Sequence, residues 1–195
     1  MPAESDSELV RRAQKNDEEA FRALVERYIS LTGSIAYGLL GDFSLAEDAV
    51  QETFLRVYRY LKSLKNPAMF RQFLARTAKT VALGYIRKEK AEKRGHPLPF
   101  STFQEDKEEG VEFSADDDSS PETTLTDEEL SRLVLREIEA LPGDYREVIV
   151  MRYLEGLGCE EMAELLDENS TAVEARLFRA REILRQKLKR YLKGD

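Results

Sequence analysis

The sequence predicts an all-α fold with two helical domains joined by an acidic flexible linker. Apolar residues recur at spacings of three and four along most of the chain, which is the periodicity of helices with one buried face. No segment shows the alternation of apolar and polar residues that a half-buried strand requires. Three segments fit the capping box, in which a hydroxyl and a glutamate satisfy the first free amides of a helix, and they begin at Ser5, Ser44 and Thr126.

A polar stretch separates the two groups of predicted helices. Between residues 95 and 125 the apolar pattern fades into Gly, Pro, Ser and Asp, a composition that buries too little surface to offset the entropy of ordering it. We therefore expect a first domain over residues 5–94, a linker over residues 95–125 and a second domain over residues 126–193.

The charges divide unevenly among these segments, although the whole chain carries a net charge of −8. Residues 104–129 contain twelve Asp and Glu against Lys107 alone. Residues 56–95 contain twelve Lys and Arg against two Glu, and residues 173–193 contain eight against two. Local basic patches, rather than total charge, determine the affinity for phosphates. Both basic segments are therefore candidate DNA surfaces, and the acidic linker is expected to compete with DNA for them in the free protein.

The composition also argues against several classes of function. A single Cys159 and a single His96, far apart in the sequence, form no metal-ligand cluster, and one Cys cannot close an internal disulfide. There is no Gly-rich phosphate loop and no pair of carboxylates in apolar surroundings. No run of about 18 apolar residues and no signal sequence is present, so we expect no membrane insertion and a cytoplasmic location. We expect no metal, no other cofactor and no catalytic residue.

In the first domain, a helix that is both basic and aromatic is predicted after a break at Pro67. Phe70, Leu74, Ala78 and Val81 follow helical spacing and are expected in the core. Arg and Lys are interleaved with this stripe. A single-strand binder needs charge to follow the backbone, and rings or a cavity to hold an unstacked base.

In the second domain, the pattern predicts a short helix over residues 160–166, a polar turn over 167–170 and a longer helix after it. This arrangement is the geometry that presents a second helix to the major groove. Arginines on the flanks of the second helix could reach phosphates or guanine edges, and they are Arg176, Arg179, Arg181 and Arg185. The spacing alone also fits a helical hairpin whose basic face is only solvated or binds an acidic protein.

Two longer stretches carry a resemblance to a known family. Residues 141–181 contain Leu-Pro-Gly-Asp-Tyr-Arg-Glu-Val, Glu-Glu-Met-Ala-Glu-Leu-Leu and Arg-Leu-Phe-Arg-Ala-Arg, and they resemble region 4 of the bacterial extracytoplasmic-function (ECF) sigma factors of RNA polymerase. Residues 46–58 begin Ala-Glu-Asp-Ala-Val-Gln-Glu-Thr-Phe and resemble region 2 of the same family. The resemblance implies a sigma region 2 helical bundle followed by a sigma region 4 helix-turn-helix, in a transcription initiation factor that is not an enzyme.

The resemblance also implies partners and site residues. The expected contacts with core RNA polymerase, at the clamp helices of its largest subunit, are Asp48, Gln51 and Glu52. The expected contacts with the downstream promoter element, where melting begins, are Lys62, Lys65, Asn66, Arg71, Phe73, Arg76, Lys79 and Arg87. The expected contacts with the upstream element are Ser170, Thr171, Arg176, Arg179, Arg181 and Arg185. The flap of the second-largest polymerase subunit and an anti-sigma factor are the other expected partners.

The chain departs from the family pattern at several positions. Asp167 stands where a turn glycine is usual, and Glu174 adds a negative charge near the expected DNA face. Thr80 and Gly84 replace an asparagine and an aspartate in the helix after Pro67. Three alternatives therefore remain: a helix-turn-helix regulator that never binds polymerase, an enzyme, and a sigma-like decoy that has lost promoter binding. Specific transcription by a reconstituted polymerase distinguishes them.

Overall fold

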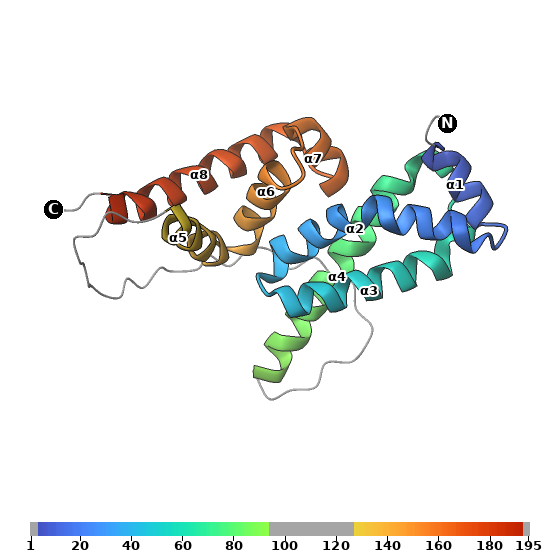
Figure 1. The fold of residues 1–195 in the computed structure, drawn as a ribbon, viewed down its shortest axis with the longest axis horizontal. Helices are drawn as coiled ribbons and strands as arrows, with labels where there is room; N and C mark the ends of the chain where they lie inside the picture. The colour runs from blue at the N-terminus through green and yellow to red at the C-terminus, as the bar shows by residue number, and fades with distance from the viewer. Residues whose placement is uncertain (1–3, 94–126, 193–195) are drawn as a thin grey trace.

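The computed structural model describes residues 4–93 and 127–192. All regular structure in these two ranges is helical, which confirms the expected fold class (Figure 1). The first range contains α1 (Asp6–Ala13), α2 (Glu18–Leu40), α3 (Phe43–Tyr60), the 3₁₀ helices η1 (Leu61–Ser63) and η2 (Pro67–Met69), and α4 (Phe70–Lys93). The second contains α5 (Asp127–Glu139), α6 (Gly143–Tyr153), α7 (Cys159–Leu166) and α8 (Ser170–Leu192). None of these helices combines the length and the apolar character needed to cross a lipid bilayer.

Two expected features fall outside this description. The linker expected at residues 95–125 lies outside the described residues, and so does Thr126, the first residue of the third expected capping box. The competition with DNA expected of the acidic linker therefore stays a prediction.

The helix starts show which capping residues the chain uses. At α1 the expected box is confirmed, because the carboxylate of Glu8 accepts from the amide of Ser5 at 2.9 Å while the hydroxyl of Ser5 accepts from the amide of Glu8. The box expected at Ser44 is wrong. Gly41 ends α2 in the left-handed conformation, so Asp42 is the first extended residue, and it caps α3 by accepting from the amide of Leu45 at 2.9 Å.

Helices α1 to α4 form a bundle around the apolar stripe of α4. The four stripe residues expected in the core are each at most 2% exposed, which confirms this expectation, and they are Phe70, Leu74, Ala78 and Val81. The ring of Phe70 meets that of Tyr28 on α2 edge to face, with centroids 5.5 Å apart. The hydroxyl of Tyr28 in turn donates to the carboxylate of Asp6, so α1, α2 and α4 are joined at one point.

Helices α7 and α8 form the expected helix-turn-helix. Asp167 ends α7 with a φ of +60°, a left-handed conformation that glycine adopts most readily and that Asp tolerates better than most residues. The side chain of Asn169 accepts from the amide of Thr171 at 2.9 Å and satisfies one of the free amides at the start of α8. The inner stripe of α8 packs on α7 through buried residues that include Val173, Leu177, Met162 and Leu166.

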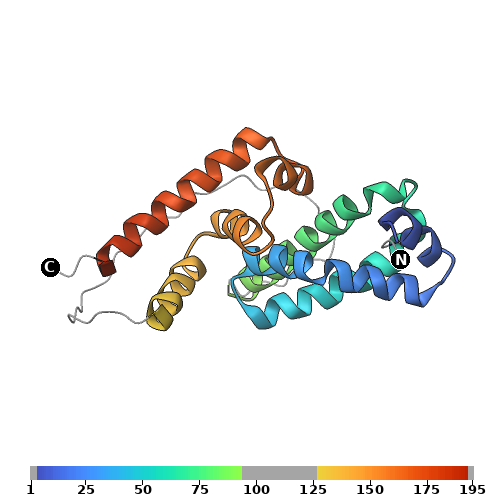
Figure 2. The same ribbon diagram turned by 45° about the horizontal axis from the view of Figure 1, so that its top comes forward.

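The two modules pack against each other, because α2 of the first lies against α6 of the second (Figures 1 and 2). Buried residues of both modules belong to one continuous hydrophobic core. The closest approach is at Gly38, where a Cβ would lie 2.7 Å from the Cα of Glu147. At the start of α6, a Cβ on Gly143 would lie 3.1 Å from the carbonyl oxygen of Leu39. Two glycines on facing helices thus let the backbones of α2 and α6 touch.

We expect Phe70→Ala to lower the free energy of unfolding by about 3–5 kcal/mol, because it leaves a cavity in the core of the first module. Urea unfolding followed by circular dichroism measures the loss. Met69→Ala is the matched control, since Met69 is the preceding residue and is 46% exposed, and it should cost about 0.5 kcal/mol. Equal losses in the two variants would contradict the place given to Phe70.

Candidate nucleic-acid interface

The expected polymerase contacts lie on α3. Asp48 and Gln51 are exposed, whereas Glu52 is half-buried and its carboxylate pairs with Arg56 at 2.8 Å. Burial, followed by the negative charges of Glu52 and Asp48, raises the pKa of Tyr85 on α4 above its usual value. Beside Gln51 an open groove runs between α2, α3 and α6, and the apolar residues that line it include Ile29, Phe43, Val50 and Leu154. α3 therefore presents a polar edge next to an apolar groove, a combination typical of protein docking surfaces.

The loop expected to capture a base, residues 62–68, is held by a residue that the sequence did not indicate. Gln14, directly after α1, donates from Nε2 to the carbonyl oxygens of Leu61 and Leu64, at 2.9 Å each. Asn66 caps η2 by accepting a hydrogen bond from a backbone amide at 3.1 Å. The exposed residues of this loop include two expected contacts, Lys62 and Lys65. No motif around Gln14 predicts that it anchors a loop about 50 residues further along.

The basic face of α4 turns toward the second module. Three expected DNA contacts on it pair with acids of α7 and of the turn that follows: Arg71 with Glu161 at 3.7 Å, Arg76 with Asp167 at 2.8 Å and Lys79 with Glu168 at 3.3 Å. The other two expected contacts on α4 differ, since Phe73 packs half-buried against the core and Arg87 is exposed. The pairs could not be foreseen, because Lys79 and its partner are 89 residues apart in the sequence.

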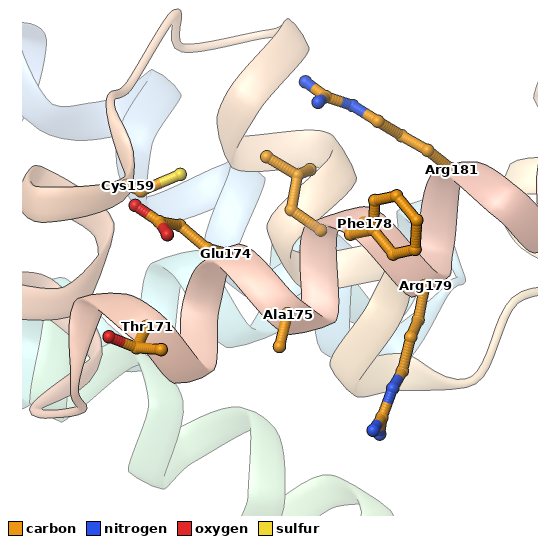
Figure 3. Close-up of a pocket in the computed structure, with 8 residues that line it drawn as sticks. Cys159, Thr171, Glu174, Ala175, Phe178, Arg179 and Arg181 are labelled. Carbon is orange, nitrogen blue, oxygen red and sulfur yellow. The ribbon is translucent and has the colours of Figure 1, made fainter.

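The outer face of α8 carries most of the residues expected at the upstream element. Arg179 and Arg181 project from different sides of the helix, with Phe178 between them (Figure 3). Arg181 donates to the hydroxyl of Tyr153 at 3.1 Å, and Glu174 stays exposed on the same face. The remaining expected contacts on the outside of this helix are Ser170 at its start, Thr171 and Arg185.

Phe178 is a surface residue that the sequence analysis missed. It is 69% exposed, although a large apolar residue on a helix is usually buried. Its position next to Leu177, outside the inner stripe of α8, was the available indication. An exposed ring between two arginines can make apolar contact with a thymine methyl group as well as stack on a base.

Arg176 lies differently from the other arginines of α8. Its side chain is only 19% exposed, and its guanidinium pairs with Glu168 at 2.7 Å. The carboxylate of Glu147 is 3.7 Å from the same guanidinium. In this arrangement Arg176 therefore contacts α6 and the turn after α7, and it does not project with Arg179 and Arg181.

Glu147 is a buried carboxyl group at the contact between the modules. It is 0% exposed, and neither carboxylate oxygen has a hydrogen-bond partner within residues 4–93 and 127–192. Burial raises its pKa to about 7, although attraction to Lys79 and Arg176 opposes this shift, and repulsion from Glu168 and Asp144 adds to it. The docked arrangement therefore favours the protonated form of Glu147.

Comparison with known proteins agrees with this geometry. The family described as Sigma-70 region 2 matches residues 24–92, and the family described as Sigma-70, region 4 matches residues 131–184. The ECF RNA polymerase sigma-E factor of Escherichia coli K12 is 36% identical over 188 residues, which cover 94% of each chain. The sigma-E factor of Haemophilus influenzae is 32% identical over 184 residues, which cover 94% of this chain and 95% of the relative.

Solved structures show the same fold. CnrH, solved in complex with the cytosolic domain of CnrY, matches with a TM-score of 0.63 at 24% identity and covers 95% of this chain and 98% of its own. The sigma factor RpoE of Bartonella quintana, solved with the anti-sigma factor NepR, matches with a TM-score of 0.60 at 19% identity and covers 87% of this chain and 96% of its own.

Fold and surfaces together define a sigma-70-type transcription initiation factor with a region 2 module and a region 4 module. The chain belongs to the family of ECF RNA polymerase sigma factors. It is therefore a factor that binds RNA polymerase and promoter DNA.

We expect the docking of the two modules to weaken as the pH rises through about 7. The pKa of Glu147 is about 7 when the modules are docked, against an ordinary value of 4.5. The docked state holds the extra proton between these values, so this contribution to docking is fully present below about 4.5 and is lost as the pH rises through about 7. The ratio of docked to separated molecules should fall about tenfold between about pH 6 and about pH 8, which small-angle scattering detects as a larger radius of gyration.

The control for this prediction is a carboxyl group elsewhere on the surface. Glu147→Gln stays neutral and should remove the pH dependence, whereas Glu164→Gln, at an exposed position of α7, should retain it. A dependence of equal size in Glu147→Gln and the unchanged protein would assign it to other groups.

Proposed function

We propose that this chain directs core RNA polymerase to promoters through three surfaces. The polymerase binds α3, the downstream promoter element binds α4 and the loop before it, and the upstream element binds α8. The observation that supports this division is the separation of charge, with an acidic and amide edge beside the apolar groove on α3 and basic faces on α4 and α8. The chain acts by binding alone, as a cytoplasmic protein without catalytic residues, metal or other cofactor.

The polymerase contacts in this proposal are Asp48, Gln51 and Glu52, which meet the clamp helices of the largest subunit. Asp48 and Gln51 are exposed, so they are free to form hydrogen bonds across an interface. The adjacent groove supplies the apolar area that a stable contact needs. The flap of the second-largest subunit holds the second module.

Melting of the downstream element is assigned to α4 and residues 62–68. Arg76 and Arg87 are exposed on α4, and Lys62 and Lys65 lie on the loop that Gln14 anchors. Unstacking a base costs a few kcal/mol, which backbone charge and a pocket offset. An anchored loop is suited to this task, because it need not be ordered again when DNA binds.

Two kinds of contact with the upstream element are proposed for α8. Thr171 and Arg179 near the start of the helix reach base edges, and Arg181 and Arg185 contact phosphates. Arg176 joins them only when Glu168 releases its guanidinium.

An anti-sigma factor is the proposed regulator. The structures of CnrH and of RpoE from Bartonella quintana were solved with CnrY and with the anti-sigma factor NepR. Both proteins share the fold of this chain, and we extend this type of partner to it by analogy.

Reconstituted transcription tests the proposed polymerase surface. Purified chain and core polymerase, incubated with fragments of host genomic DNA, should give transcripts that start at a small set of related promoters. Asp48→Arg and Gln51→Ala should each reduce affinity for core polymerase by about tenfold, since interface contacts of this kind contribute about 1–2 kcal/mol. Glu26→Arg, a charge reversal at an exposed position of α2, is the control and should bind normally. Equal affinity in all three variants would remove the assignment to α3, and absence of specific transcripts would remove the function.

Promoter binding separates the two proposed roles on α8. Arg179→Ala should cost about 1–3 kcal/mol and relax the preference at one promoter position, because a base contact is lost. Arg185→Ala should weaken binding to all sequences alike and lower the slope of the salt dependence by about 1. Electrophoretic mobility shifts with single-position promoter variants measure both effects. Identical profiles in the two variants would mean that α8 contacts only the DNA backbone.

A further inference from the structure

The second module covers the face of α4 that we propose for DNA. Along α4, Arg71, Arg76 and Lys79 meet acids in the order Glu161, Asp167 and Glu168. Each acid presents a carboxylate where a phosphate of bound DNA would otherwise pair with the cation. The acids come from the end of α7 and the turn that leads into α8.

One of these acids engages both proposed DNA surfaces. The carboxylate of Glu168 pairs through Oε1 with Lys79 of α4 at 3.3 Å and through Oε2 with Arg176 of α8 at 2.7 Å. Arg176 is further enclosed by the buried carboxyl of Glu147, at 3.7 Å. A single side chain at the contact between the modules therefore occupies a cation of the melting helix and a cation of the recognition helix.

We infer that the docked arrangement is autoinhibitory, because the acids at the end of α7 occupy the place of DNA phosphates on α4 until the two modules separate. The inference rests on the proposed role of α4 in binding DNA. In a free chain that is mostly docked, only the separated fraction binds nucleic acid, so the apparent affinity is reduced by that fraction. Separated fractions of about 1–10% reduce the affinity by about 10- to 100-fold.

The apolar contact, rather than the ion pairs, determines whether the modules dock. The side chains of Arg76 and Asp167 are 62% and 70% exposed, and exposed pairs contribute little to stability. By contrast, α2 and α6 share a buried core and touch at Gly38, where any Cβ would meet the Cα of Glu147 at 2.7 Å. A side chain at position 38 therefore separates the modules without changing a residue that we assign to DNA or polymerase.

The test compares Gly38→Leu with Gly33→Leu in the full chain. Gly33 lies five residues earlier on α2, and a Cβ there would have no atom within 4 Å, so its variant controls for the change of residue type. We measure the radius of gyration by small-angle scattering, and binding to a fluorescein-labelled single-stranded oligothymidine by fluorescence anisotropy at low salt, without polymerase. Gly38→Leu should be more extended and should bind about tenfold more tightly than the unchanged protein, and Gly33→Leu should match the unchanged protein.

A second pair of variants leaves the packing of α2 and α6 intact. Asp167→Asn combined with Glu168→Gln removes the carboxylates that pair with α4 and α8, and it should also raise oligonucleotide affinity severalfold. Glu160→Gln combined with Glu164→Gln makes the same change of charge at two other exposed positions of α7 and serves as the control. An equal gain in both double variants would attribute the effect to net charge and overturn the inference.

The outcomes also separate this inference from the proposed function. If Gly38→Leu is extended but binds the oligonucleotide no more tightly, docking does not block DNA binding and the inference is wrong. It is equally wrong if the scattering profile of Gly38→Leu matches that of the unchanged protein and the Asp167 and Glu168 variant gains no affinity. Promoter-specific transcription with core polymerase is measured in parallel, so a normal transcript in either case leaves the proposed function in place. A chain that shows the expected gains but directs no specific transcription would instead support autoinhibition and overturn the proposed function.

Discussion

The contact between the backbones of α2 and α6 at Gly38 is the constraint on which the rest of the structure depends. With the helices this close, Glu147 is fully buried and its pKa rises to about 7. The same contact brings α7 against α4, so that basic residues assigned to DNA meet acids of the other module. Packing, titration and the availability of the proposed DNA surfaces are therefore consequences of one close approach.

The relative sizes of the interactions suggest how such a contact can be both formed and released. Exposed ion pairs contribute about 0–1 kcal/mol each, whereas full burial of one large apolar side chain contributes about 1.5–3 kcal/mol. The apolar core shared by the modules thus decides whether they dock, and the pairs decide which cations are covered. The unpaired carboxyl of Glu147 is a cost within the same contact. Core polymerase, by holding α3 and the second module at separate sites, would supply the opposing free energy.

Much of the architecture was predictable from the sequence, because it is local. Helical periodicity and turn residues were enough for α2, α3, α4 and the helix-turn-helix, and the inner stripe of α4 is buried as its spacing indicates. The start of α3 was misplaced, since the left-handed Gly41 makes Asp42 the cap before Ser44 is reached. The docking of the modules, the enclosure of Arg176 and the anchoring of the loop by Gln14 depend on contacts between distant segments, which periodicity and charge counts do not contain. Gly38 in mid-helix was a trace of the docking that only the structure explains.

The distance between the modules, in the free chain and on the polymerase, tests the central claim most directly. Cysteines introduced by Lys15→Cys and Glu164→Cys, at exposed positions of the two modules, carry a donor and an acceptor dye in a chain whose own thiol is removed by Cys159→Ser. Single-molecule energy transfer should show mainly one high-transfer population in the free chain, and saturating core polymerase should convert it to low transfer. A free chain already dominated by low transfer, or a high-transfer population that polymerase leaves unchanged, would contradict the account.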